Sequence, residues 1–265
     1  MAQPLPKKDA LASELTDALA RGDSVTEFEF RRYLKDIEKY SSGLESVYLK
    51  ALANGLANKK DKAVEHFEKV LQIPNIDYAI SYAGNYLAYI NQRGSFSERK
   101  EVAQRLARQY ESPSFCFMAY QSNIFSGDVS GADEFYKKYI KLSQEKESEL
   151  LSKDFQGAKL KLQEFRDGSG LSEEQVVILA NSIIQVIDAN DVHVHRIEII
   201  SNKVHEERVN IYNMSVLTDD VELLAEMNFQ LAYKLAEYDE LLDKKFSACI
   251  RGHEKNKRKE ITPCL

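Results

Sequence analysis

Apolar residues recur along the first half of the chain at helical spacing, in stripes separated by short polar turns. In 44–57 they lie on one face of a helix, and a second stripe occupies 62–73 after the polar turn Asn58–Asp61. Pro74 ends the second stripe, because proline lacks the N–H that a helix interior uses. Neither helix can bury its stripe alone, so the pattern predicts a helical hairpin that packs against neighbours.

The same pattern returns at a fixed distance along the chain. The clearest evidence is a triplet: Ala63, Phe67 and Val70 correspond to Ala132, Tyr136 and Tyr139, each 69 positions later. At about half of that distance another hairpin fits at 78–110, and an earlier one fits within 11–37.

These hairpins resemble the tetratricopeptide repeat family, whose unit of about 34 residues forms two antiparallel helices. The resemblance covers about residues 8–145 and is degenerate, because the chain has no Trp and Ser97 or Glu98 stands where the family has a small apolar residue. It implies an α-solenoid whose first helices line a groove that binds a protein or peptide. The matching positions are Ala63, Phe67 and Pro74 in one unit and Gly127, Ala132 and Tyr136 in another.

The second half of the chain follows a different pattern. A helix over 144–166 continues the helical part as a cap, and Ser172 begins another helix with a capping box. Alternating apolar residues then predict strands at 192–199 and 208–217, a helix follows Thr218, and 246–250 is a short third strand. The order α-β-β-α-β predicts a small α+β domain, so the fold class is mainly α: an α-solenoid followed by this domain.

Asp167–Gly170 is the strongest linker signal, because Gly and Ser favour turns and loops. The sequence therefore predicts a helical-repeat domain with its capping helix over 8–166 and a small α+β domain over 171–252. Residues 253–265 are expected to form a basic flexible tail.

Composition narrows the class of protein without naming an activity. The 265 residues are 43% hydrophobic and 29% charged, which is ordinary for a globular protein. No apolar run approaches the length of a membrane span, the first residues lack the apolar core of a secretion signal, and three scattered cysteines make no disulfide framework. We expect a cytoplasmic protein that does not contact a membrane.

Charge is distributed unevenly. Residues 146–250 hold 20 acidic and 11 basic side chains, whereas 1–145 are balanced. Because phosphate binding needs a basic surface, the body of the protein is not expected to bind nucleic acid. The basic tail leaves contact with phosphate or an acidic partner open, although a solvated terminus explains it as well.

His193 and His195 are the weak candidates for metal binding, because residues two apart on a strand face the same side and can share an ion. His205, Cys249 and His253 lie on or near the other expected strands and are candidates for the remaining ligands of a zinc ion. The alternative is two polar residues on the wet face of a half-buried sheet. The chain has no nucleophile elbow and no phosphate-binding loop, so we expect no cofactor, no catalytic residue and no enzyme activity.

Polar residues of the expected first helices are the candidates for partner binding, because Asn amides can donate to and accept from an extended backbone. The resemblance adds that Asn and Lys on these helices hold a partner's terminal carboxylate. The candidate residues are Lys50, Asn54, Asn85, Tyr89, Gln121 and Asn123.

The sequence therefore favours a non-enzymatic adaptor that binds a protein or peptide, with the C-terminal domain as a candidate for homodimerisation or for docking a second partner. A first alternative is a regulator in a toxin or phage-defence system, antitoxin-like, whose acidic domain masks a basic surface. A second alternative is a metal-dependent enzyme centred on His193 and His195.

Overall fold

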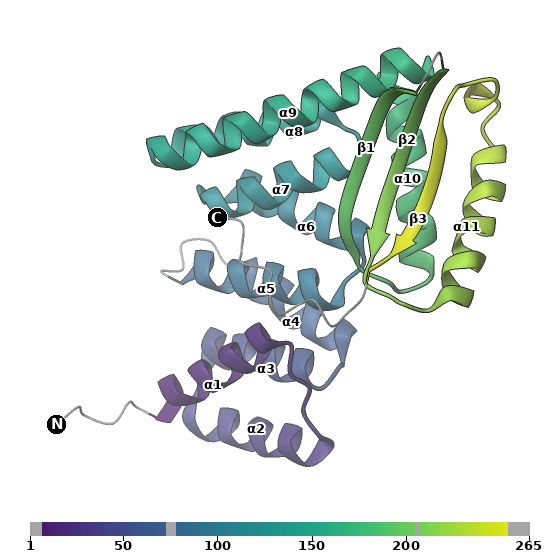
Figure 1. The fold of residues 1–265 in the computed structure, drawn as a ribbon. Helices are drawn as coiled ribbons and strands as arrows, with labels where there is room; N and C mark the ends of the chain where they lie inside the picture. Colours follow the sequence, from purple (N-terminus) through teal and green to yellow (C-terminus); the bar gives the residue numbers. More distant parts are fainter. Residues whose placement is uncertain (1–6, 73–77, 205–206, 254–265) are drawn as a thin grey trace. The chain divides into compact units, whose positions relative to one another are not determined.

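The computed structural model describes residues 7–72, 78–204 and 207–253, and it is mainly α-helical with one small sheet (Figure 1). The predicted fold class is confirmed: in these described ranges, ten helices precede three strands and an eleventh helix, in the order that the sequence indicated. The chain forms two compact units, Met1–Gly94 and Ser95–Leu265.

Helices of the first unit pack against their neighbours in pairs, as a helical repeat requires. The helix starts follow the sequence: Thr26 forms a capping box with Glu29, in which each side chain accepts from the other residue's backbone N–H. The helices are α1 (Lys7–Arg21), α2 (Glu27–Tyr40), α3 (Gly43–Leu56), α4 (Lys60–Leu71) and α5 (Ala79–Arg93).

An aromatic cluster fills the space between α4 and α5. The ring of Phe67 stacks on Tyr86 with centroids 5.0 Å apart and lies 5.8 Å from Tyr89. Gly55 of α3 lets the ring of Tyr89 approach, because a Cβ at this position would lie 2.9 Å from a ring carbon. The repeated small and aromatic positions of the sequence are therefore packing positions of the core.

In the described part of the second unit, five helices come before the sheet. Ser95 and Ser172 form capping boxes at the starts of α6 and α10, the latter as the sequence predicts. The helices are α6 (Phe96–Gln109), α7 (Pro113–Phe125), α8 (Val129–Leu142), α9 (Glu145–Ser169) and α10 (Glu173–Ala189).

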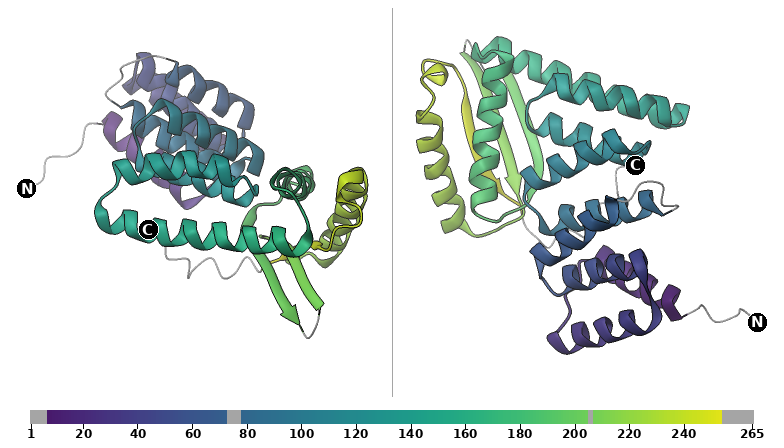
Figure 2. Two further views of the ribbon diagram at one scale, coloured as in Figure 1. Left: turned by 90° about the horizontal axis from the view of Figure 1, so that it is seen from above. Right: turned by 180° about the vertical axis from the view of Figure 1, so that it is seen from behind.

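A three-stranded sheet completes the second unit. β1 (Val194–Val204) pairs antiparallel with β2 (Glu207–Val216), and β2 pairs parallel with β3 (Ser247–Gly252), so the strand order is β1-β2-β3. The parallel pair is joined through α11 (Val221–Ala236), because parallel strands need a crossover connection. Figure 2 shows α10 lying across one face of the sheet, and α11 packs along β3.

One hydrophobic core joins α6 and the C-terminal part of α9 to α10, α11 and the strands. Phe96 of α6 and Phe165 of α9 belong to the same buried cluster as Leu179 of α10, Tyr212 of β2 and Ile250 of β3. The predicted division of the chain at 167–170 therefore falls inside a compact unit, whose buried side chains come from both sides of it.

The prediction of a flexible linker at Asp167–Gly170 is wrong. Residues 167–169 form the last turn of α9, and Gly170, at φ 74°, ends the helix in the left-handed region that glycine tolerates. Ser169 is 3% exposed, and its backbone oxygen accepts from the N–H of Lys245 at 3.0 Å. Gly168 lies against Asn210, where a Cβ would collide with the amide oxygen. The glycines serve close packing and helix termination here.

Some sequence expectations fall outside the described residues. Pro74 lies in the gap at 73–77, and all of the predicted basic tail after His253 lies beyond the last described residue. In the part of the chain that is described, no helix has both the length and the apolarity to cross a membrane.

Candidate functional site

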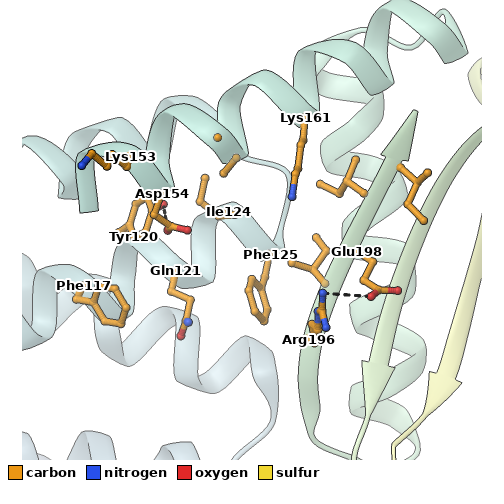
Figure 3. A pocket seen from close by; sticks show the side chains of 15 residues that line it. Phe117, Tyr120, Gln121, Ile124, Phe125, Lys153, Asp154, Lys161, Arg196 and Glu198 are labelled. Carbon is orange, nitrogen blue, oxygen red and sulfur yellow. Dashed lines mark hydrogen bonds and ion pairs between the residues drawn. The ribbon is translucent and has the colours of Figure 1, made fainter. Parts of the chain in front are cut away.

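A groove in the second unit is lined by α7, α9 and β1, and we name it the α7–α9–β1 groove (Figure 3). Its volume is about 510 Å³, which is within the range of ligand sites. Five residues of α7, five of α9 and five of β1 line it: Phe117, Tyr120, Gln121, Ile124, Phe125, Lys153, Asp154, Gly157, Ala158, Lys161, Arg196, Ile197, Glu198, Ile199 and Ile200.

The strand side of the groove is an edge of the sheet. β1 is the first strand of the order β1-β2-β3, and among the described residues no strand pairs with its other edge. Side chains of a strand alternate between two faces, yet the five consecutive residues 196–200 all line this one cavity. The groove therefore runs along the edge of β1, where alternate backbone N–H and C=O groups point away from β2.

The opposite edge of the sheet is covered. The side chain of Asn228 in α11 donates to the backbone oxygen of Ile250 at 2.9 Å and accepts from the N–H of the same residue at 3.0 Å. One amide group thus makes both hydrogen bonds that a neighbouring strand would make to β3 at this residue. The two edges of the sheet differ, because α11 covers β3 at Ile250 whereas the α7–α9–β1 groove runs along β1.

A hydrogen bond joins the two helical walls of the groove. The phenol of Tyr120 in α7 donates to the carboxylate of Asp154 in α9 at 2.8 Å. Burial, together with this carboxylate, raises the pKa of Tyr120 well above its ordinary value, so the phenol remains a donor even in alkaline solution. Tyr120 therefore fixes the spacing between α7 and α9 at neutral pH.

The groove presents both apolar surface and charge. Phe117 and Phe125 lie on its α7 side, and Lys161 reaches from α9 toward β1 (Figure 3). Arg196 forms an ion pair with Glu198 at 3.3 Å, whereas Lys161 makes no ion pair with any other described residue. Lys161 is thus a cation in the groove that is available to an acidic group of a ligand.

Gly157 leaves room in the α9 wall. A Cβ built at this position would meet no atom within 4 Å, apart from its own helix and chain neighbours. The residue lies between Lys153 and Lys161 on the face of α9 that lines the groove. A larger side chain at this position would project into the cavity without displacing the protein's own atoms.

Of the six residues predicted to bind a partner, one lines the groove. Gln121 belongs to the α7 wall, whereas Lys50 and Asn85 are half-buried in the first unit. The amide of Asn85 donates to the phenol oxygen of Tyr48 at 2.6 Å. The structure therefore does not bring these predicted residues together as one site.

The other three predicted partner-binding residues are part of the protein interior. Asn54 is 4% exposed and donates to the backbone oxygen of Lys50, one turn earlier in α3. Asn123 is fully buried and accepts from the side chain of Gln104 at 2.8 Å. Tyr89, at 1% exposure, belongs to the aromatic cluster of the first unit.

Sequence reasoning missed Tyr120, Asp154 and Lys161, because they come from two helices that only the fold brings together. A signal for the strand edge was nonetheless present. Ile199 and Ile200 are consecutive apolar residues after the alternating stretch Ile197–Ile199, so both faces of β1 carry apolar side chains at this point. Such a doubling is typical of a strand that is covered on more than one side.

The histidines do not form a metal cluster in the described residues, where no group of three His, Cys, Asp or Glu side chains could hold an ion. His195 stacks on His253 with ring centroids 4.3 Å apart. Cys249 lies elsewhere and contacts the amide oxygen of Asn213 at 3.4 Å. His205 is outside the described residues.

Comparisons with protein families, with curated proteins and with solved structures find no match to this chain.

Proposed function

We propose that the protein is a non-enzymatic adaptor that binds an extended segment of a partner protein in the α7–α9–β1 groove. The observation that carries this proposal is the run of five consecutive β1 residues along one wall of the cavity. An extended peptide that lies in the groove can pair with the outward backbone groups of this edge, as in other cases of strand addition.

The lining residues specify the chemistry of the segment. Backbone pairing with β1 gives affinity with little dependence on sequence, and side-chain contacts then select the partner. Phe117, Ile124 and Phe125 favour apolar side chains, and Lys161 favours a carboxylate. The expected partner segment therefore has apolar residues at alternate positions and at least one acidic residue.

The proposed class of function is the one that the sequence favours, but the binding site is the α7–α9–β1 groove and not the groove of the helical repeats. Peptide binding by the helical groove of the resemblance depended on six residues, of which Asn54, Tyr89 and Asn123 are buried. A partner segment also suits the charge of this part of the chain, since the acidic excess in 146–250 disfavours nucleic acid. We assign the protein no catalytic role and a cytoplasmic location within the same proposal.

Selection from a displayed library of short linear peptides tests the proposal. Peptides selected on the wild-type protein should bind about tenfold more weakly to Gly157→Leu, because the new side chain fills the groove. The control is Lys159→Leu, which adds the same side chain at an exposed position of the same helix outside the groove. Equal binding by the wild type and by both variants would contradict the proposed site.

A further inference from the structure

The outward side of α11 is apolar, although it faces solvent. Val221 is 75% exposed, Phe229 is 65% exposed and Tyr233 is 77% exposed, and three exposed alanines lie among them. With 3.6 residues per turn these positions fall on one side of the helix. We name this the α11 outer face, formed by Val221, Ala225, Phe229, Ala232, Tyr233 and Ala236.

The α11 outer face is not needed to hold the helix in place. On its opposite side α11 buries Met227 and Leu231 completely or nearly so, and Asn228 bonds to both backbone groups of Ile250. A surface helix usually carries polar residues on its outward side. α11 is therefore apolar on two sides, and its own unit uses one of them.

Acidic residues lie at one side of the α11 outer face and at its N-terminal end. Glu222 falls between Phe229 and Tyr233 around the helix, and Glu226 lies just beyond Tyr233. Both are exposed, and Asp219 and Asp220 precede the first turn. The basic residue of the helix, Lys234, lies toward the inner side and pairs with Glu237 at 2.9 Å. The apolar face thus carries negative charge along one side and at its N-terminal end, and no basic residue of α11 offsets this charge.

We propose that the α11 outer face docks an amphipathic helix of another protein, whose apolar stripe is flanked by basic residues. The apolar residues give the contact area, and the three alanines allow two helix backbones to approach closely. The acidic border selects a basic partner by charge complementarity. This site shares no residue with the α7–α9–β1 groove, so the protein has two surfaces for two different segments.

A second copy of the chain fits this surface less well. In an antiparallel pair of α11 helices, Asp219 and Asp220 of one copy would approach Glu237 of the other. In a parallel pair the two acidic borders would lie side by side. Both arrangements place like charges together, which destabilises association. The charges therefore favour a basic helix over self-association.

Fluorescence anisotropy with two labelled synthetic helices tests the inference on the full chain. One peptide carries Leu along one face with Lys at the flanking positions, and the other has Glu in place of each Lys. The Lys-flanked peptide should bind at least about tenfold more tightly than the Glu-flanked one. Phe229→Ser should weaken its binding about tenfold, whereas Leu160→Ser, which removes an equally exposed apolar side chain of α9, should not change it.

The double variant Glu222→Gln with Glu226→Gln should lose most of the preference for the Lys-flanked peptide over the Glu-flanked one. It should still bind both peptides through apolar contact. Equal binding of the two peptides by the wild type, or full binding by Phe229→Ser, would overturn the inference. Sedimentation of the wild type provides a second check. A dimer that Phe229→Ser abolishes would assign the surface to a second copy and would also overturn it, and a monomer in both cases is the expected result.

Discussion

Asp188, near the end of α10, accepts a hydrogen bond from the backbone N–H of Phe96 at 2.7 Å, at the start of α6. The same carboxylate accepts from the N–H and the hydroxyl of Ser97. It thereby satisfies donors at the positive end of a helix that is 92 positions away in sequence. The sequence predicts α10 as the first helix of the small α+β domain. Asp188 joins this helix to α6, which belongs to the helical part of the second unit.

Replacing this carboxylate should destabilise the second unit. We expect Asp188→Ala to lower the free energy of unfolding by about 2 kcal/mol, because three hydrogen bonds to a charged acceptor are lost. Arg99, whose pKa burial lowers to about 10, also loses the favourable charge of Asp188. Urea denaturation followed by circular dichroism measures the change. Asp191→Asn is the control at an exposed residue nearby, and an unchanged unfolding midpoint in Asp188→Ala would contradict the role given to this contact.

Two glycines of α9 should respond oppositely to alanine. Gly157→Ala should stabilise the protein by about 0.8–1 kcal/mol, because alanine favours a helix and the added Cβ meets no atom. Gly168→Ala should destabilise it, because the Cβ would collide with Asn210. Thermal unfolding of the two variants beside the wild type checks both signs. Stabilisation by Gly168→Ala would show that this segment is not packed as described.

Stability should fall in mild acid through the stacked histidines. Burial, followed by the charges of His253 and Arg196, lowers the pKa of His195 from its ordinary value. The unfolded chain therefore binds the proton more readily than the folded chain does. The stability that neutral His195 contributes is complete above about pH 6.5, and it is lost as the pH falls toward the lower pKa of the folded state. His195→Gln should show a shallower decrease in unfolding midpoint between about pH 7 and pH 5. Identical pH profiles would rule out His195 as the cause.

The sequence predicted most of the elements, because their signals are local. Ser172 and Gln175 form the capping box that begins α10, and the alternation in 208–217 matches β2 within a residue at each end. The linker was mistaken because glycine permits flexible connections, left-handed helix ends and close packing alike. Gly170 ends α9 in the left-handed region, and Gly168 permits close packing against Asn210. Only the neighbouring residues in the fold distinguish these uses of glycine from a flexible connection.

The site was harder to predict for a different reason. Asn54 and Asn123 each donate to the backbone oxygen four residues earlier in their own helix. This bond allows the amide to be buried, so a polar residue on a predicted first helix does not have to face a partner. The α7–α9–β1 groove, in contrast, needs three segments that meet only in the fold. Its edge strand depends on which strands pair, and no local pattern states that order.

The most direct test of the strand-addition account is amide hydrogen–deuterium exchange with a peptide selected from the displayed library. Binding should slow exchange at alternate residues within 196–200, because their outward N–H groups become hydrogen-bonded to the peptide. At a peptide concentration near the wild-type Kd, Gly157→Leu should lose most of this protection, and Lys159→Leu should retain it. Unchanged exchange in β1, with new protection instead around Lys50 and Asn85 in the first unit, would contradict the account and return the binding site to the helical array.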